Sequence, residues 1–210
     1  MRAVARGPRR RQVMDESTQV MTEILQDDVN LAVWRRHLPA QIEDFALLAL
    51  SLGKPLADQR MIEVDDAQPT VLQGLLPGAT DLQGHEGFCA DVAWIVDAYA
   101  CLLGARRVGL RLRVLDNPMC PRFHVDQVPV RLLCTYAGHG SEWLQAGAAD
   151  LLGLASTPEP VDNIHRLQAG DVALLKGEKW LGNEGAGLIH RSPSSQPGER
   201  RLLLSLDWLA

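Results

Sequence analysis

Residues 107–114 read Arg-Val-Gly-Leu-Arg-Leu-Arg-Val, with apolar residues at every second position. This period is typical of a half-buried β-strand, because successive side chains of a strand point to opposite faces. The preceding stretch, residues 86–103, instead places its apolar residues at helical spacing and ends at Gly104. The chain therefore changes from helical to extended character near residue 106.

Short strands are expected on the C-terminal side of this change, separated by turns rich in glycine and proline, at residues 122–127, 130–137, 171–175, 188–191 and 201–208. Such a succession indicates a barrel or sandwich. On the N-terminal side, helical structure is expected at residues 17–25 and 41–52. We therefore predict an α+β fold in three parts: a flexible arginine-rich tail (1–14), a mainly helical support region (15–105) and a jelly-roll barrel (106–210).

Composition excludes several classes of protein. The first eleven residues hold five arginines and no acid, and the remaining 16 basic and 26 acidic residues give the body a net charge of -10. An acidic body does not favour nucleic-acid binding. No apolar run approaches the roughly 20 residues that a bilayer requires, so we expect no membrane span. The four cysteines form no CxxC pair and no signal peptide is visible, which predicts reduced thiols and a cytoplasmic location.

The segment Cys120-Pro-Arg-Phe-His124-Val-Asp126 carries the first chemical signal. On a strand, His124 and Asp126 would share one face and could bind one metal ion. His190, 66 residues later on another expected strand, would be the third ligand. Two histidines and one carboxylate with open positions are typical of a non-haem iron(II) site. Cys120 is either a small buried residue or an extra soft ligand that would favour zinc.

Arg201 follows His190 by eleven residues and opens the last expected strand. Alternation places Arg201, Leu203 and Ser205 on one face of that strand. The other face is apolar, and Arg200 lies on that face. An arginine near the metal could bind a carboxylate with two parallel hydrogen bonds. A shift of one residue in register would exchange Arg200 and Arg201.

This ordered set, His124-x-Asp126, His190 and Arg201, resembles the iron(II)/2-oxoglutarate-dependent oxygenases, whose fold is a cupin-like double-stranded β-helix. The resemblance covers about residues 107–208 and includes the stretch 169–177, which is similar to the strand that precedes the distal histidine. In detail the chain is most similar to an uncharacterised bacterial family known as a domain of unknown function. The phrases that carry this likeness lie at residues 122–126, 135–138, 182–185 and 188–193.

The resemblance implies a role for each matching residue. His124, Asp126 and His190 would hold Fe(II), and Arg201, with Ser205, would bind the distal carboxylate of 2-oxoglutarate. A hydroxylation of an unknown substrate would follow. Tyr136, Arg131 and Lys176 are further candidate contacts of the cosubstrate, and Lys176 is also an alternative to Arg201.

Two other functions remain open at the level of sequence. A non-catalytic cupin-like protein could hold zinc on the same three ligands, with Cys120 as a fourth, and serve zinc homeostasis. A degenerate barrel could act only as an interaction module. The apolar helical layer could cover the barrel or mediate a homodimer.

Overall fold

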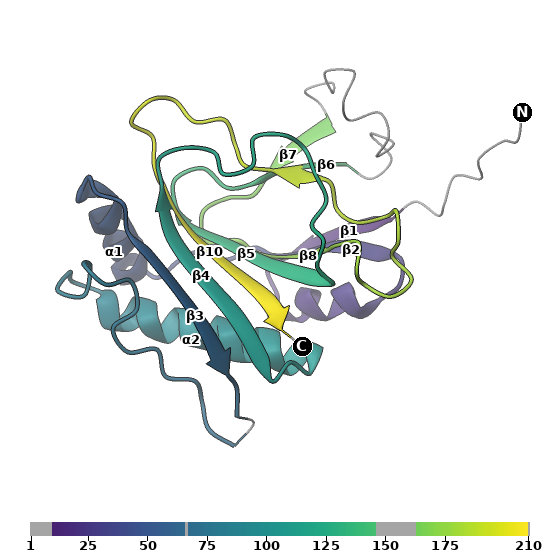
Figure 1. Ribbon diagram of the computed structural model, residues 1–210, viewed down its shortest axis with the longest axis horizontal. Coiled ribbons are helices and arrows are strands. Elements are labelled where there is room, and N and C mark those ends of the chain that lie inside the picture. The colour runs from purple at the N-terminus through teal and green to yellow at the C-terminus, as the bar shows by residue number, and fades with distance from the viewer. Residues whose placement is uncertain (1–9, 66, 146–162, 210) are drawn as a thin grey trace, which may run out of the picture.

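The computed structural model describes residues 10–65, 67–145 and 163–209, and most of its regular structure is β-sheet (Figure 1). The large sheet has seven strands in the order β1-β2-β8-β5-β10-β4-β3, and all its pairs are antiparallel except β1 with β2. Its strands are β1 (Arg11–Asp15), β2 (Val29–Trp34), β3 (Ala57–Glu63), β4 (Arg107–Leu115), β5 (Val130–Ala137), β8 (Val172–Lys176) and β10 (Arg201–Leu209).

A smaller antiparallel sheet has the order β7-β6-β9 and lies across from the large one (Figure 1). It is formed by β6 (Glu142–Leu144), β7 (Ile164–Arg166) and β9 (His190–Arg191). Apolar side chains from both sheets, among them Leu133 and Leu203 from the large sheet and Trp143 from the small one, form one buried cluster. The odd-numbered residues of β10 therefore face the space between the sheets.

Three helical segments pack on the opposite face of the large sheet: the 3-10 helix η1 (Thr18–Leu25), α1 (Ala40–Ser51) and α2 (His85–Leu103) (Figure 1). Phe45 of α1 and Phe88 of α2 share the main core with Leu202, Leu204 and Leu206 of β10. These three leucines of β10 are thus buried under helices, as their apolar character predicts, whereas Trp208, expected on the same apolar face, is exposed near the end of the strand.

Helix α2 carries two aspartates within its apolar sequence, and both have partners. Asp91 binds the Arg36 guanidinium through two contacts of 2.6 and 2.9 Å. Asp97 accepts a hydrogen bond from the backbone N–H of Thr70. The helix ends at Gly104, whose φ of 63° is left-handed, a conformation that glycine adopts without steric cost.

The sequence predicted both long helices and five strands after residue 106 within a residue or two of their observed ends. It did not predict β1, β2 and β3, which lie before residue 106 yet join the large sheet. The support region is therefore part helix and part strand, and residues 11–14, expected in the flexible tail, belong to β1. Residues 1–9 of that tail lie outside the described residues.

The strand predicted at residues 122–127 is wrong. This segment is a loop that makes one isolated antiparallel bridge, between His124 and His190. Within the described ranges, no helix combines the length and apolar character needed to cross a bilayer.

Candidate metal centre

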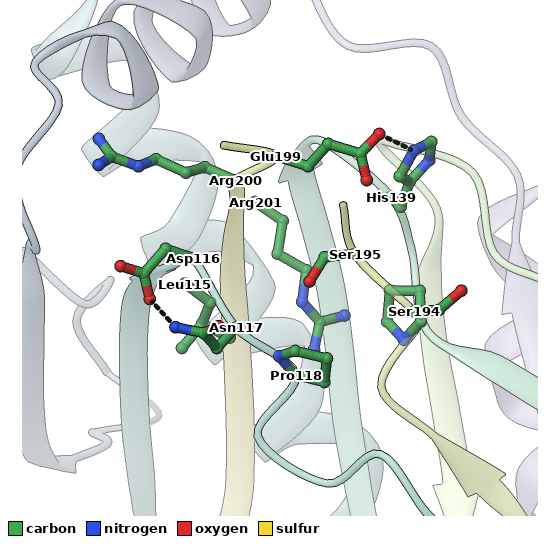
Figure 2. Close-up of a pocket in the computed structure, with 11 residues that line it drawn as sticks. Leu115, Asp116, Asn117, Pro118, His139, Ser194, Ser195, Glu199, Arg200 and Arg201 are labelled. Atoms are coloured by element: carbon green, nitrogen blue, oxygen red, sulfur yellow. Dashed lines mark hydrogen bonds and ion pairs between the residues drawn. The ribbon is translucent and has the colours of Figure 1, made fainter. Parts of the chain in front are cut away.

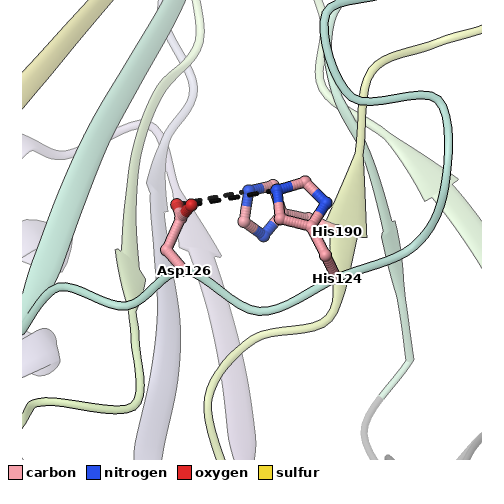
Figure 3. Close-up of side chains that lie close together, drawn as sticks. All are labelled: His124, Asp126 and His190. Carbon is pink, nitrogen blue, oxygen red and sulfur yellow. Dashed lines mark ion pairs between the residues drawn. The ribbon is translucent and has the colours of Figure 1, made fainter.

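His124, Asp126 and His190 meet at one point between the two sheets (Figure 3). One nitrogen or oxygen atom from each lies within 4.8 Å of the others. His124 and His190 face each other because their backbones form two hydrogen bonds of 3.0 Å, and their ring centres are 4.6 Å apart. The backbone carbonyl of Asp126 accepts a 3.0 Å hydrogen bond from the N–H of Glu178, which anchors the loop from the other side.

The two imidazoles are oriented so that their Nε2 atoms point to Asp126. The Nδ1 atom of His124 is 3.0 Å from the carbonyl oxygen of Arg122, and that of His190 is 3.1 Å from the carbonyl oxygen of Leu188. Because a carbonyl only accepts, each Nδ1 carries the proton and each Nε2 keeps a free lone pair. The Nε2 atoms lie 3.8 Å and 3.4 Å from Oδ1 and Oδ2 of Asp126, respectively.

The carboxylate of Asp126 is held on one side only. Its Oδ1 accepts a 2.6 Å hydrogen bond from Arg131, whereas Oδ2 is buried and has no hydrogen-bond partner within the described part of the chain. A buried oxygen without a partner is costly, and a cation between Oδ2 and the two Nε2 atoms would satisfy all three. Two imidazole nitrogens and one carboxylate oxygen suit Fe(II) or Zn(II), so this donor set fits a metal ion.

The protonation states also suit a metal ligand set. Burial, followed by the nearby imidazole of His190, lowers the pKa of His124 and favours the neutral ring. Burial raises the pKa of Asp126, but interactions with His190, Arg131 and His124 outweigh it and the pKa is lowered overall. The carboxylate of Asp126 is therefore ionised and the imidazole of His124 neutral at neutral pH.

A cavity of about 110 Å³ opens beside the three residues, and we call it the central cavity. His124 and His190 line it, together with five arginines, three serines, three apolar residues and a cysteine, among them Arg113, Arg131, Arg201, Leu203, Ser141, Ser192, Ser205 and Cys120. A hollow of about 20 Å³ adjoins it and shares Arg201 (Figure 2).

Arg201 lies in the wall of the central cavity as its place in the alternation predicts. Figure 2 shows its side chain and that of Arg200 extending in different directions from β10, and Arg200 donates to the carbonyl of Gly53 outside the cavity. The Arg201 guanidinium is buried and donates to the hydroxyls of Ser141 and Ser192, at 3.4 and 3.0 Å. Burial lowers its pKa to about 10, so it remains cationic at neutral pH and has no acidic partner among the described residues.

Two other expected cosubstrate contacts lie elsewhere. Tyr136 is buried among the helices, packs on Phe88 and donates a 2.7 Å hydrogen bond to Asp91. Lys176 is also on the helical side, where its ammonium donates to the carbonyl of Gln26 and lies over the ring of Trp180. Neither lines the central cavity. The expectation that they touch a cosubstrate there is corrected by this placement.

The remaining candidates do lie at the cavity. Ser205 lines it, but four residues along β10 put it roughly 13 Å from Arg201 at the backbone. Ser141 and Ser192, which the sequence did not single out, are the hydroxyl groups beside Arg201. Cys120 lines the cavity without joining the three-residue group, as far as the described residues show, and its role as an extra ligand stays a prediction.

Comparison with known protein families identifies the family of the chain. The family model described as a protein of unknown function, DUF1826, matches residues 15–207. The chain belongs to the DUF1826 family. This confirms the likeness to a domain of unknown function that the sequence motifs indicated. No curated protein sequence matches the chain.

Solved structures are similar to this DUF1826 protein at low identity. A Shewanella oneidensis protein whose oxygenase activity is inferred matches with a TM-score of 0.53 at 10% identity, over 96% of this chain and 90% of the other. A Pseudomonas putida prolyl-4-hydroxylase has a TM-score of 0.46 at 12% identity, over 91% and 97%. A dioxygenase for auxin oxidation from Arabidopsis thaliana, solved with 2-oxoglutarate, has 0.46 at 12%, over 96% and 92%. At these identities the likeness concerns the fold alone.

Proposed function

We propose that this DUF1826 protein is an oxygenase that depends on Fe(II) and 2-oxoglutarate and is built on a cupin-like double-stranded β-helix. The observation that carries the proposal is the meeting of His124, Asp126 and His190 beside Arg201, a buried cation without an acidic partner in the described chain. A zinc-holding protein has no need of such an arginine. A cosubstrate with a free carboxylate does need one.

Different residues of the chain would bind the metal and the cosubstrate. The Nε2 atoms of His124 and His190 and the Oδ2 of Asp126 would hold the metal. Arg201 would bind the distal carboxylate of 2-oxoglutarate, while the hydroxyls of Ser141 and Ser192 keep its guanidinium in place. Fe(II), when bound with the keto acid, supplies the oxidation, in which dioxygen and 2-oxoglutarate yield succinate, carbon dioxide and a hydroxylated substrate.

Binding of 2-oxoglutarate to the Fe(II)-loaded protein without oxygen tests the proposal directly. We expect saturable binding in the wild type and at least roughly tenfold weaker binding for Arg201→Ala, since a lost charge-assisted hydrogen bond costs about 1.5–3 kcal/mol. Metal content should not change. Arg200→Ala is the matched control, because its guanidinium leaves the same strand toward the other face.

The proposal fails if the iron-loaded wild type does not bind 2-oxoglutarate. Metal analysis of protein purified without added metal provides the second arm. Tightly held zinc, reduced in Cys120→Ser, together with absent 2-oxoglutarate binding, would favour the zinc-holding alternative. Loss of metal in His190→Ala would exclude a pure interaction module.

A further inference from the structure

The arginines that line the central cavity outnumber the carboxylates that pair with them. Five arginines line it: Arg111, Arg113, Arg131, Arg191 and Arg201. Asp207 pairs with both Arg111 and Arg131, and Glu142 pairs with Arg191. Across the part of the chain that the structure describes, Arg113 and Arg201 have no carboxylate partner. A cosubstrate at Arg201 would still leave Arg113 without an anion.

Arg113 belongs to the same wall as Arg201 but occupies a separate position. It lies on β4 opposite Leu203 of β10, whereas Arg201 lies opposite Leu115. One strand across and two residues along put the two backbones roughly 8 Å apart. Arg113 is half-buried, so its guanidinium is partly withdrawn from water and gains from an anionic partner inside the cavity.

The protein as a whole carries the opposite sign of charge to its cavity. The chain has a net charge of -5, which disfavours large polyanions such as nucleic acids. A cationic cavity in an acidic body therefore favours a small anion that fits inside. The local field of clustered arginines attracts such a ligand, and a guanidinium fork matches carboxylate and phosphate alike.

We propose that the molecule oxidised at this site is a small organic acid, bearing a carboxylate or a phosphate group, and that Arg113 binds that group. This inference rests on the proposed function, because it assigns Arg201 to 2-oxoglutarate and leaves Arg113 for the second ligand. Arg113 acts as a specificity-determining residue. The reacting carbon would lie between the anionic group and the metal centre.

The test uses the full-length protein loaded with Zn(II), which prevents turnover, and saturated with 2-oxoglutarate. Acetate and methyl phosphate serve as the two anion probes, and their binding is measured by titration calorimetry. We expect one probe to bind saturably at one site per chain. The tighter probe decides between a carboxylate and a phosphate.

Arg113→Gln should weaken binding of that probe roughly tenfold or more while leaving 2-oxoglutarate affinity unchanged. Arg113→Lys, which keeps the charge but not the fork, should lose less. Arg106→Gln is the matched control, because it removes an exposed arginine next to the far end of β4, and it should change neither affinity.

Three results would overturn the inference: no saturable probe binding to the 2-oxoglutarate complex, unchanged probe affinity in Arg113→Gln, or an equal loss of 2-oxoglutarate affinity in that variant. The last result would mean that both arginines bind the cosubstrate. If 2-oxoglutarate itself does not bind, the proposed function fails, whereas Arg113-dependent binding of a probe would still uphold the anion site.

Discussion

Arg131 connects the candidate metal centre to the large sheet, and its removal is the most informative single perturbation. It donates to Asp126 at 2.6 Å and to Asp207 at 2.7 and 3.0 Å. Arg131→Met keeps an unbranched apolar stem but deletes the guanidinium. Asp207 would still be paired with Arg111, so the carboxylate left without a cation is that of Asp126.

The size of the effect follows from how deeply this pair is buried. Breaking a buried ion pair costs about 3–5 kcal/mol, because the remaining charge stays out of water. The side chains of Arg131 and Asp126 are 20% and 9% exposed, which places the pair at the lower end of that range. We therefore expect the metal-free protein to lose about 3 kcal/mol of unfolding free energy. For a chain of this length that corresponds to roughly 6–12 °C in Tm.

The assay is thermal and urea unfolding of chelator-treated protein, since a bound metal would compensate for the lost charge. Arg106→Met is the control and should change stability by less than about 0.5 kcal/mol, as an exposed substitution. A double-mutant cycle with Asp126→Asn isolates the pair. We expect a coupling energy of at least about 1.5 kcal/mol between the two positions, so additive effects would refute the account.

Three further predictions concern other parts of the molecule. Tyr136→Phe should leave 2-oxoglutarate affinity unchanged but cost roughly 1.5–3 kcal/mol in unfolding free energy, because the hydroxyl donates to Asp91; weaker cosubstrate binding would contradict its placement under the helices. Burial lowers the pKa of Lys176 from 10.5 to about 8, so between these values the unfolded chain binds more protons and the stability of the wild type should rise with pH. Lys176→Met should remove that rise in urea unfolding, and identical pH profiles would count against the low pKa. A Cβ at Gly187 would lie 2.2 Å from Cγ1 of Val125, so Gly187→Ala should displace the loop between His124 and Asp126 and reduce metal content; full metal occupancy by mass spectrometry would show that the loop adapts.

Local periodicity was sufficient to predict those helices and strands whose apolar residues follow a single spacing along their whole length. Helix α2 and strands β4 and β10 each carry most of their apolar residues on one stripe or one face, so the residues alone indicate both their type and their orientation. The choice of Arg201 over Arg200 rested on this alternation, and in the structure Arg201 lines the central cavity whereas Arg200 donates to Gly53 outside it.

For β5, the alternation of residues did not show which side chains face the helices and which face the cavity. Seven of its eight residues are buried, because helices cover one face and the small sheet covers the other. Tyr136 therefore could not be assigned to a face from the sequence, and it lies on the side away from the cavity. Arg131, five residues earlier on the same strand, faces the cavity instead.

The features that the sequence did not predict depend on contacts between residues distant in sequence. The loop that carries His124 and Asp126 is held by backbone hydrogen bonds to His190 and Glu178, more than 50 residues away, so no local pattern predicts it. Strand β2 is a short apolar stretch whose partners, β1 and β8, come from both ends of the chain. Ser141 and Ser192 likewise become partners of Arg201 only once the two sheets face each other.

The two unlike faces of the large sheet have a practical consequence for anyone who redesigns this protein. Even-numbered positions of β4 and β10, apart from the exposed Trp208, lie under the helices, whereas odd-numbered positions such as 111, 113, 203 and 205 line the central cavity. A combinatorial library confined to positions 113 and 205 would diversify ligand preference while leaving both buried apolar clusters untouched. In a saturation mutagenesis experiment, losses of protein abundance and losses of catalytic turnover should therefore alternate residue by residue along both strands.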